Sequence, residues 1–345
     1  MSLTDKAHVD ESEHVAVKPR KRGCLGHCIK LWWAYLIGFI VLVILVVCLV
    51  IFVGIPKIAQ SKLDDAELTI DGIVITNTQS NQLSMAINST IRSDGKIHAT
   101  IAGFVGDMYL EDLEGHIPFA RINFPETTSD ALQVVNISQT LSLVDVTAIT
   151  TFNTWLLTSS LLRVTVHGDT TVKVKGVAKL FPVTFHKTIE MPGLNLLSGL
   201  AVTNSSIKLG GDENGDNFFA TVNIPNTSLF TIELGNTSFH NYLLGKDVGT
   251  VFIDDLTLVP GDANKYPMRA AISQNDILDT LGESPYCDKT NGVLPFQLRG
   301  KSVVNHGQNI TYFANALASA NQTVEIDLGT PVKALLGKLI PCGGL

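Results

Sequence analysis

Three oxygen-bearing side chains, Asp212, Asn214 and Asp216, stand at alternate positions in a glycine-rich run, a spacing that resembles the start of a calcium-binding loop. An EF-hand loop also needs glycine at its sixth position and glutamate at its twelfth, where this sequence has Asn217 and Asn223. The run also contains an Asn-Gly pair, which is preferred at the tip of a tight β-hairpin. We therefore expect a solvated hairpin here in preference to a weak calcium site.

No arrangement typical of catalysis appears in the sequence. The Gly-x-Ser-x-Gly, His-Glu-x-x-His, phosphate-loop and dinucleotide-binding motifs are all absent. The nine histidines are scattered, and His167, His186 and His240 stand at polar positions of strand-like runs, where a solvent-facing side chain is the usual case. We therefore predict a protein that is not an enzyme and that holds no cofactor or metal ion.

The five cysteines are too few for a disulfide framework, but they form two pairs of interest. Cys287 and Cys342 are candidates for a disulfide; two free buried thiols are the alternative, because the sequence does not report the distance between them. Cys24 and Cys28 stand one helical turn apart beside basic residues, with too few further ligands for zinc. Reversible S-palmitoylation and unmodified thiols are both open for this second pair.

An apolar segment at residues 31–54 has no charged residue in 24 positions and lies between Lys30 and Lys57. As a helix it is about 36 Å long, enough to cross a hydrocarbon core of about 30 Å. A cleaved signal peptide has a shorter apolar core and a small-residue cleavage site, which does not follow here. We predict a single-pass transmembrane helix that serves as a signal anchor, after a disordered tail over residues 1–30.

Charge on the two sides of this helix predicts its direction. Residues 1–30 carry six basic and four acidic residues, a net +2, whereas the rest of the chain carries 19 and 28, a net −9. The positive-inside rule then places residues 1–30 in the cytosol and the carboxy-terminal part in the lumen or outside the cell. Sequons for N-glycosylation agree with this topology, and we expect several to be used: Asn88, Asn136, Asn204, Asn226, Asn236, Asn309 and Asn321.

Beyond the helix, apolar and polar residues alternate in short runs, for example at residues 68–75 and 250–253. This pattern, with Gly, Asn and Asp between the runs, favours antiparallel sheets with one buried face, and an all-β sandwich is the natural solution. A composition of 45% hydrophobic and 17% charged residues excludes disorder over most of the chain, and a net charge of −7 gives no electrostatic footprint for nucleic acid.

Similar segments recur in the same order in the two halves of this part. The run that ends at Asn77 resembles the run that ends at Asn204, and helix-like runs at residues 148–157 and 273–281 are each followed by a strand-like run. We interpret these halves as two copies of one unit, which we call module 1, residues 58–192, and module 2, residues 193–345.

Module 2 contains the most specific pattern: Ile224-Pro225-Asn226, a strand-like run ending at Gly235, a Pro260-Gly261 turn, and then Arg269. It resembles the type 2 late-embryogenesis-abundant (LEA) domain, and more closely the fungal vacuolar-membrane proteins of the Tag type, which have a short cytosolic tail, one transmembrane helix and lumenal LEA-like modules. The resemblance implies two tandem immunoglobulin-like β-sandwiches, each with a short helix, at a vacuolar membrane, with the plasma membrane as the alternative. Module 1 lacks the proline and glycine of the pattern, so its membership rests on position.

Two interpretations of the apolar strands remain open. Runs such as residues 180–185 and 251–253 are apolar on more than one face, which fits either a closed core or sheets splayed around a cleft for a lipid chain. The LEA-like resemblance favours lipid without assigning residues. We expect a non-enzymatic membrane glycoprotein that binds or transfers lipid; the alternative is a structural or adaptor protein whose sandwiches bind a protein partner.

Overall fold

The computed structural model describes residues 24–143 and 145–343, with side chains from residue 32 onward. The predictions for residues 1–23 and for the side chains of Cys24 and Cys28 therefore lie outside the described part. Residues 24–30, predicted to belong to a disordered tail, are helical. The prediction was wrong there because this segment contains no proline, and extending an existing helix adds one hydrogen bond for each residue that is fixed.

Helix α1 (Cys24–Leu49), the π-helical turn η1 (Val50–Gly54) and helix α2 (Ile55–Asp65) follow one another along the chain. The stretch Trp32–Asp65 is long and apolar enough to span a membrane, and its most apolar part is not buried against the rest of the described chain. This N-terminal helix fits a single-pass membrane protein or a signal anchor. The chain from Pro56 to Leu345 forms a separate compact unit.

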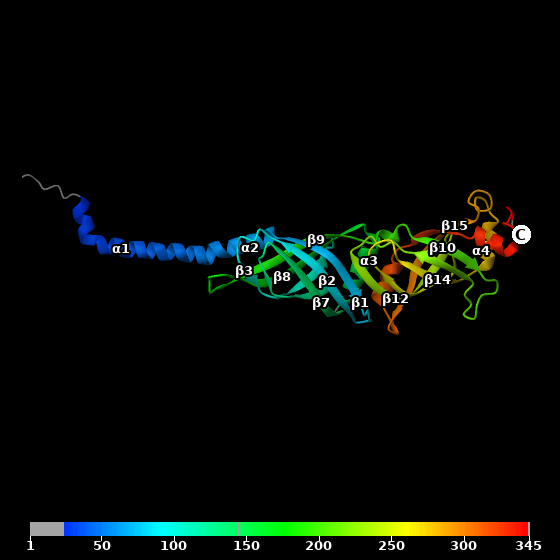
Figure 1. Ribbon diagram of the computed structural model, residues 1–345, viewed down its shortest axis with the longest axis horizontal. Coiled ribbons are helices and arrows are strands. Elements are labelled where there is room, and N and C mark those ends of the chain that lie inside the picture. The colour runs from blue at the N-terminus through cyan, green and yellow to red at the C-terminus, as the bar shows by residue number, and fades with distance from the viewer. Residues whose placement is uncertain (1–23, 144, 344–345) are drawn as a thin grey trace, which may run out of the picture. The chain divides into compact units, whose positions relative to one another are not determined.

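The predicted mainly β fold is confirmed, and the strands of Pro56–Leu345 form two sheets (Figure 1). Sheet A contains β1 (Glu67–Thr76), β2 (Gln82–Arg92), β7 (Leu132–Ser142), β10 (Ala201–Ile207), β11 (Phe218–Asn223), β12 (Phe230–Leu243), β13 (Lys246–Leu258), β14 (Lys265–Ile272), β15 (Val293–Asn305), β16 (Gln308–Asn309) and β17 (Gln322–Asp327). Sheet B contains β3 (Ala99–Ile101), β4 (Phe104–Leu110), β5 (Ala120–Phe124), β6 (Thr127–Thr128), β8 (Leu161–Val174) and β9 (Leu180–Pro192). The helical elements are α3 (Val146–Thr158), η2 (Asn195–Leu197), α4 (Gln274–Leu281), α5 (Thr311–Ala318) and α6 (Gly329–Leu336), so that α3 and α4 confirm the two helices expected from the sequence.

Module 1 is a two-layer sandwich in which β1, β2 and β7 face sheet B. The layers approach at one edge, where the Asn123 amide of β5 donates to Oε1 of Gln139 in β7 at 3.1 Å. Burial alternates along the strands, as in β5, where Ala120 and Ile122 are buried whereas Arg121 and Asn123 are exposed. The period of two in the sequence therefore corresponds to one face in the core and one in solvent.

Module 2 is a curved sheet whose first and last strands approach each other. Strand β12 lies between β13 and β15, and the sheet continues through β14 and β11 to β10 on one side and to β17 on the other. Strand β10 also lies beside β17, where Ser205 Oγ donates to the Asp327 carbonyl at 3.0 Å. The strands thus nearly close around the module 2 core, as in a small barrel.

Strand β12 joins the two modules into one sheet. Its residues 230–232 pair in parallel with residues 73–75 of β1, and its residues 236–243 pair antiparallel with β15. Gly235, with φ of +80°, separates these two parts, and a Cβ atom there would lie 2.7 Å from the Val304 carbonyl oxygen. Only glycine fits both this backbone conformation and this approach. The division into two modules stays a prediction, but sheet A contains strands of both.

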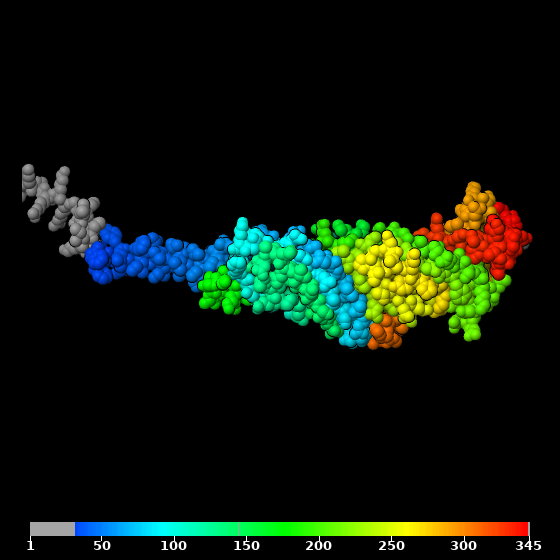
Figure 2. Space-filling model, in the orientation of Figure 1, coloured from blue at the N-terminus to red at the C-terminus, as the bar shows by residue number. Residues whose placement is uncertain are grey.

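A buried polar network also fastens the β1–β2 turn to module 2, and Figure 2 shows this turn against the β15–β16 turn. Thr78, which is fully buried, donates through Oγ1 to the Glu233 carbonyl at 3.0 Å. Asn305 Nδ2 donates to Thr78 Oγ1 at 2.8 Å and to Glu233 Oε1 at 2.9 Å. The Tyr312 hydroxyl of α5 donates to the Gln79 carbonyl at 3.0 Å. The junction therefore satisfies its buried polar groups across the two modules.

Tyr312 makes this junction sensitive to alkaline pH. Burial raises the pKa of the Tyr312 phenol well above its usual value near 10. The folded state then keeps a proton that the unfolded chain loses, so this residue makes the free energy of unfolding fall as pH rises above about 10. We expect Tyr312→Phe to lower stability by about 1 kcal/mol at neutral pH, through the lost hydrogen bond, and to flatten the alkaline decline. Denaturant unfolding between about pH 8 and pH 11.5 measures both effects, and parallel curves for the two proteins would contradict the assignment.

Candidate functional site

Module 2 encloses an apolar cavity of about 50 Å³. Strands β11 to β15 and β17 form its wall, and α3, α5 and the segment around η2 cover it. All of the described lining residues are aliphatic or aromatic except Asn153 and Gln322. Small-molecule sites in β-barrels often lie at the mouth of the barrel, so this cavity is the candidate functional site.

Helix α3 belongs to module 1 in the sequence, but its residues Asn153, Leu156 and Leu157 line the cavity of module 2. Asp145 caps its first turn by accepting hydrogen bonds from the Thr147 and Ala148 amides, at 2.8 and 3.0 Å. Phe152 stacks on Phe119 of module 1, with ring centroids 4.0 Å apart, and lies 5.9 Å from the ring of Phe230 in module 2. The helix is therefore anchored by both modules at once.

The rim segment, which we define as residues 193–200, closes the cavity beside α3. Its Leu194 and Leu197 are buried and line the cavity, and the Leu194 amide donates to the Leu156 carbonyl of α3 at 2.7 Å. Residues 195–197 have φ between +47° and +54°. This left-handed conformation costs roughly 1–2 kcal/mol for each residue that is not glycine. The rim is thus well packed but built on strained backbone.

Two buried amides in the cavity wall each have an atom without a hydrogen-bond partner in the described part of the chain. These atoms are Nδ2 of Asn153, a residue 5% exposed, and Oε1 of Gln322, a residue 1% exposed. The nitrogen of the Gln322 amide donates to the Ala320 carbonyl at 2.8 Å. Our sequence interpretation missed both residues. Asn153 stands four residues from each of the buried Ile149 and Leu157 and so lies on the apolar face of the helix. A polar side chain at such a position could have identified Asn153 as a candidate site residue.

The size of the cavity limits what it holds in this conformation. An apolar cavity of about 150 Å³ accommodates benzene, so 50 Å³ is too small for a lipid chain unless the wall moves. A second void of about 10 Å³ shares Val251 and Met268 with this cavity as lining residues. Asn241 lines this second void, and its Oδ1 also lacks a partner in the described part. Methionine is flexible, so movement of Met268 is the simplest way to join the two voids.

The loop that resembles a calcium site is a hairpin, as expected. Asp212 Oδ1 accepts hydrogen bonds from the Asn214 and Asp216 amides, both at 2.9 Å. The Asp216 carboxylate is buried and pairs with Arg269 at 2.6 Å. The carboxylate oxygens of the run therefore serve a turn and an ion pair, and they do not converge on a common point.

Arg269, the arginine named in the sequence pattern above, lies on β14 and forms ion pairs with two aspartates. Besides Asp216, its guanidinium contacts Asp254 at 3.3 Å and lies over the Phe252 ring, 4.6 Å from the centroid. These contacts connect β14, β13 and the loop before β11. The arginine therefore has a structural role on the wall that surrounds the cavity.

Replacing Arg269 by methionine would leave the Asp216 carboxylate, whose side chain is 2% exposed, without a cation. Breaking a buried ion pair typically lowers the free energy of unfolding by about 3–5 kcal/mol; we expect about 2–3 kcal/mol because the Arg269 side chain is 34% exposed. Urea denaturation measures the loss. Asp254→Asn is the matched control, since it removes only the exposed partner and should lower stability by less than about 1 kcal/mol. Equal losses in the two variants would contradict this assignment.

None of the histidines from residue 32 onward lines the cavity. His240 pairs with Asp247 at 3.0 Å on the surface. His167 and His186 lie directly opposite each other on β8 and β9, with their Nδ1 atoms 3.4 Å apart, and both are exposed. The sequence predicted their solvent-facing positions but not that they are neighbours.

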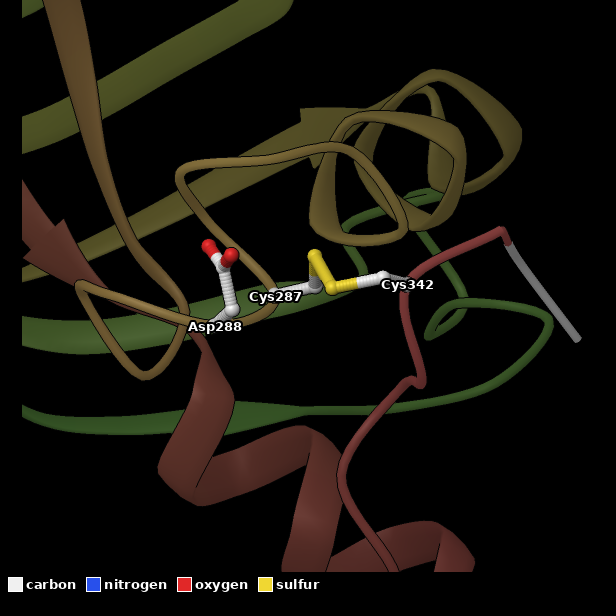
Figure 3. A group of neighbouring side chains, drawn as sticks. All are labelled: Cys287, Asp288 and Cys342. Carbon is white, nitrogen blue, oxygen red and sulfur yellow. A yellow bond between two sulfur atoms is a disulfide. The ribbon is translucent and has the colours of Figure 1, made fainter.

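The structure contains the expected disulfide between Cys287 and Cys342, whose Cα atoms are 5.2 Å apart (Figure 3). It joins the loop after α4 to the segment after α6. Asp288 lies beside it, and the three side chains are close enough together to suggest a metal site. The two sulfur atoms are bonded to each other, however, so neither is available as a thiolate ligand.

Six of the seven predicted glycosylation sites are exposed: Asn88, Asn136, Asn204, Asn236, Asn309 and Asn321. Asn226 is 2% exposed, and its Nδ2, the atom to which a glycan is attached, donates to the Phe230 carbonyl at 2.7 Å. Its Oδ1 accepts from the amide and hydroxyl of Ser228. Asn226 is therefore incompatible with a glycan in this fold, because its side chain makes hydrogen bonds within a buried turn. Glycosylation of the other six asparagines stays a prediction.

Glycopeptide mapping of the folded protein from a eukaryotic host tests this division. We expect glycans at several exposed sequons and none at Asn226, because a glycan there would have to break the hydrogen bond to Phe230. Enzymatic removal of glycans in isotopically labelled water marks each occupied asparagine, and the exposed sequons serve as internal controls. A glycan at Asn226 in folded material would overturn the structural role given to this residue.

Comparison with known proteins adds little to this description. A family model described as a protein of unknown function (DUF3712) matches residues 117–241, less than half of the chain. No curated protein matches the sequence.

Solved structures show only weak likeness. A protein from Archaeoglobus fulgidus is 9% identical, with 37% of this chain and 94% of that chain covered and a TM-score of 0.22. A bacterial adhesin from Mobiluncus mulieris is 9% identical, with 69% and 81% covered and a TM-score of 0.20. A glycosyl hydrolase family 2 member from Bacteroides cellulosilyticus is 12% identical, with 42% of this chain covered and a TM-score of 0.19; the match spans only 18% of that chain. None of these likenesses bears on function.

Proposed function

We propose that this chain is a non-enzymatic, single-pass membrane protein whose module 2 binds an apolar ligand of the lipid class in the cavity beneath α3 and α5. The observation that carries the proposal is the cavity itself, with an apolar wall in a nearly closed sheet and a helical cover to which both modules contribute. Burial of each methylene group gains about 0.8 kcal/mol, so each further carbon of a bound chain adds to the affinity of such a site.

The cavity has to widen to take a chain, and the rim segment is the part suited to move. Its strained left-handed residues relax when the rim opens, which offsets some of the packing lost by Leu194 and Leu197. Movement of Met268 extends the space toward the second void. Ligand binding is therefore coupled to a local displacement of the rim, while the sheet stays in place.

The same proposal includes a topology and a location. The basic flank of residues 1–30 and the sequons beyond the helix support a cytosolic amino terminus and a lumenal carboxy-terminal part. The disulfide fits an oxidising compartment. The LEA-like resemblance supports a vacuolar membrane, with the plasma membrane as the alternative, and the cytosolic flank carries Cys24 and Cys28 as candidates for palmitoylation.

Photolabelling of the full chain in lipid nanodiscs tests ligand binding. An aliphatic diazirine should label peptides of α3, α5 and the rim segment in a saturable way, because these elements cover the cavity. Leu256→Phe, which adds a ring at a lining residue that is 2% exposed, should reduce this labelling at least about fivefold by filling the space.

Leu83→Phe provides the matched control, because Leu83 is a strand leucine of module 1 that is 1% exposed and does not line the cavity. It carries the same overpacking penalty and should label as the unaltered protein does. Labelling confined to the membrane helix would refute the proposal. Such a result would favour the alternative, an adaptor that binds a protein partner.

A further inference from the structure

We propose that the ligand of the cavity is an apolar molecule with a neutral hydroxyl group, such as a long-chain alcohol or another hydroxylated lipid, and that Asn153 and Gln322 bind that group. This inference rests on the proposed function. It derives from the two polar side chains that the apolar wall contains, each of which is more than nine-tenths buried and has one unpaired atom.

The two unpaired atoms have complementary requirements. Asn153 Nδ2 is a donor without an acceptor, and Gln322 Oε1 is an acceptor without a donor. A hydroxyl group supplies both, since its oxygen accepts hydrogen bonds while its hydrogen is donated. A hydrocarbon supplies neither and would leave both amides buried and unpaired, which is the arrangement that proteins avoid. The wall therefore selects for a ligand with one neutral polar end.

Charged lipids fit this wall poorly. None of the described residues that line the cavity carries a charge, so an ionised carboxylate or phosphate would be buried without a counter-ion. A carboxylate also only accepts hydrogen bonds, and so it offers nothing to Gln322 Oε1. A protonated carboxylic acid offers both a donor and an acceptor, as a hydroxyl group does. The experiment therefore includes an ionised carboxylate as a probe, so that charged and neutral ligands are compared.

Competition against the photolabel in nanodiscs measures the selectivity. Decan-1-ol, decane and decanoate at pH 8 are compared at equal content in the bilayer, with labelling of the α3 and α5 peptides as the readout. We expect decan-1-ol to compete about tenfold better than decane, because only the alcohol pairs the two amides. Decanoate should compete no better than decane.

Asn153→Leu and Gln322→Met remove the amides while keeping side chains of similar size. Each should abolish the preference for the alcohol while still allowing labelling. Asn153→Leu should not destabilise the fold, because it removes an unpaired buried donor, and Gln322→Met should lower stability by about 1 kcal/mol through the lost hydrogen bond to the Ala320 carbonyl. Asn241→Leu is the matched control: Asn241 is also a buried amide with an unpaired atom, but it lines the neighbouring void, so the preference should persist.

The possible results separate the two proposals. Equal competition by decane and decan-1-ol would overturn the hydroxyl assignment and leave the apolar site intact. A preference that survives Asn153→Leu and Gln322→Met would also overturn it, and would mean that bound water satisfies the amides. Strongest competition by decanoate would replace the alcohol with an acid. Absence of saturable labelling in every protein would refute the binding function itself.

Discussion

The parallel pairing of β1 with the first residues of β12 is the interaction on which the arrangement of the two modules depends. Because β12 then pairs with β15 on the same edge, one strand belongs to the sandwich of module 1 and to the curved sheet of module 2. Gly235 makes the exchange of partners possible by letting the Val304 backbone approach. The pairing sets the place of α3, which follows β7 and therefore reaches over the open end of module 2.

This arrangement explains why the cavity lies where it does. A sheet that nearly closes on itself leaves an open end. In module 2, helices from two different parts of the chain cover that end. Helix α5 comes from module 2 and α3 from module 1, so the cover is assembled from separate parts, and a void of about 50 Å³ remains beneath it. The strained rim and the unpaired amides are found at this same place. Imperfect packing, strain and unsatisfied polar atoms together distinguish a site from an ordinary core.

Much of the fold could be predicted from the sequence, because its signals are local. The charge-free segment predicted the apolar helix, the period of two predicted the strands, and the Asn-Gly pair predicted the hairpin after Asp212. The sequence could not reveal the pairing of β1 with β12, since backbone hydrogen bonds between distant strands do not require a particular residue pattern in either strand. It also gave no warning that Asn226 is buried. A sequon is read from three residues, whereas exposure depends on the whole module.

The candidate site was harder to predict for a related reason. Apolar runs look alike whether they line a cavity or fill a core, so the sequence does not distinguish these two cases. Asn153 offered a signal, as an amide on the apolar face of α3, but Gln322 stands beside a turn, where a glutamine is ordinary. The recognition pair exists only because two segments meet in space. Neither residue alone offers both an unpaired donor and an unpaired acceptor.

The shared strand also has a consequence for how the chain is made. Residues 73–75 of β1 leave the ribosome long before residues 230–232 of β12, at roughly 5–20 residues per second, so this edge of module 1 waits for many seconds without its partner. During that time it is an open β-edge beside a membrane, of the kind that aggregates. Domains that fold strictly in the order of synthesis avoid this exposure. This chain cannot complete that edge until its later half is made.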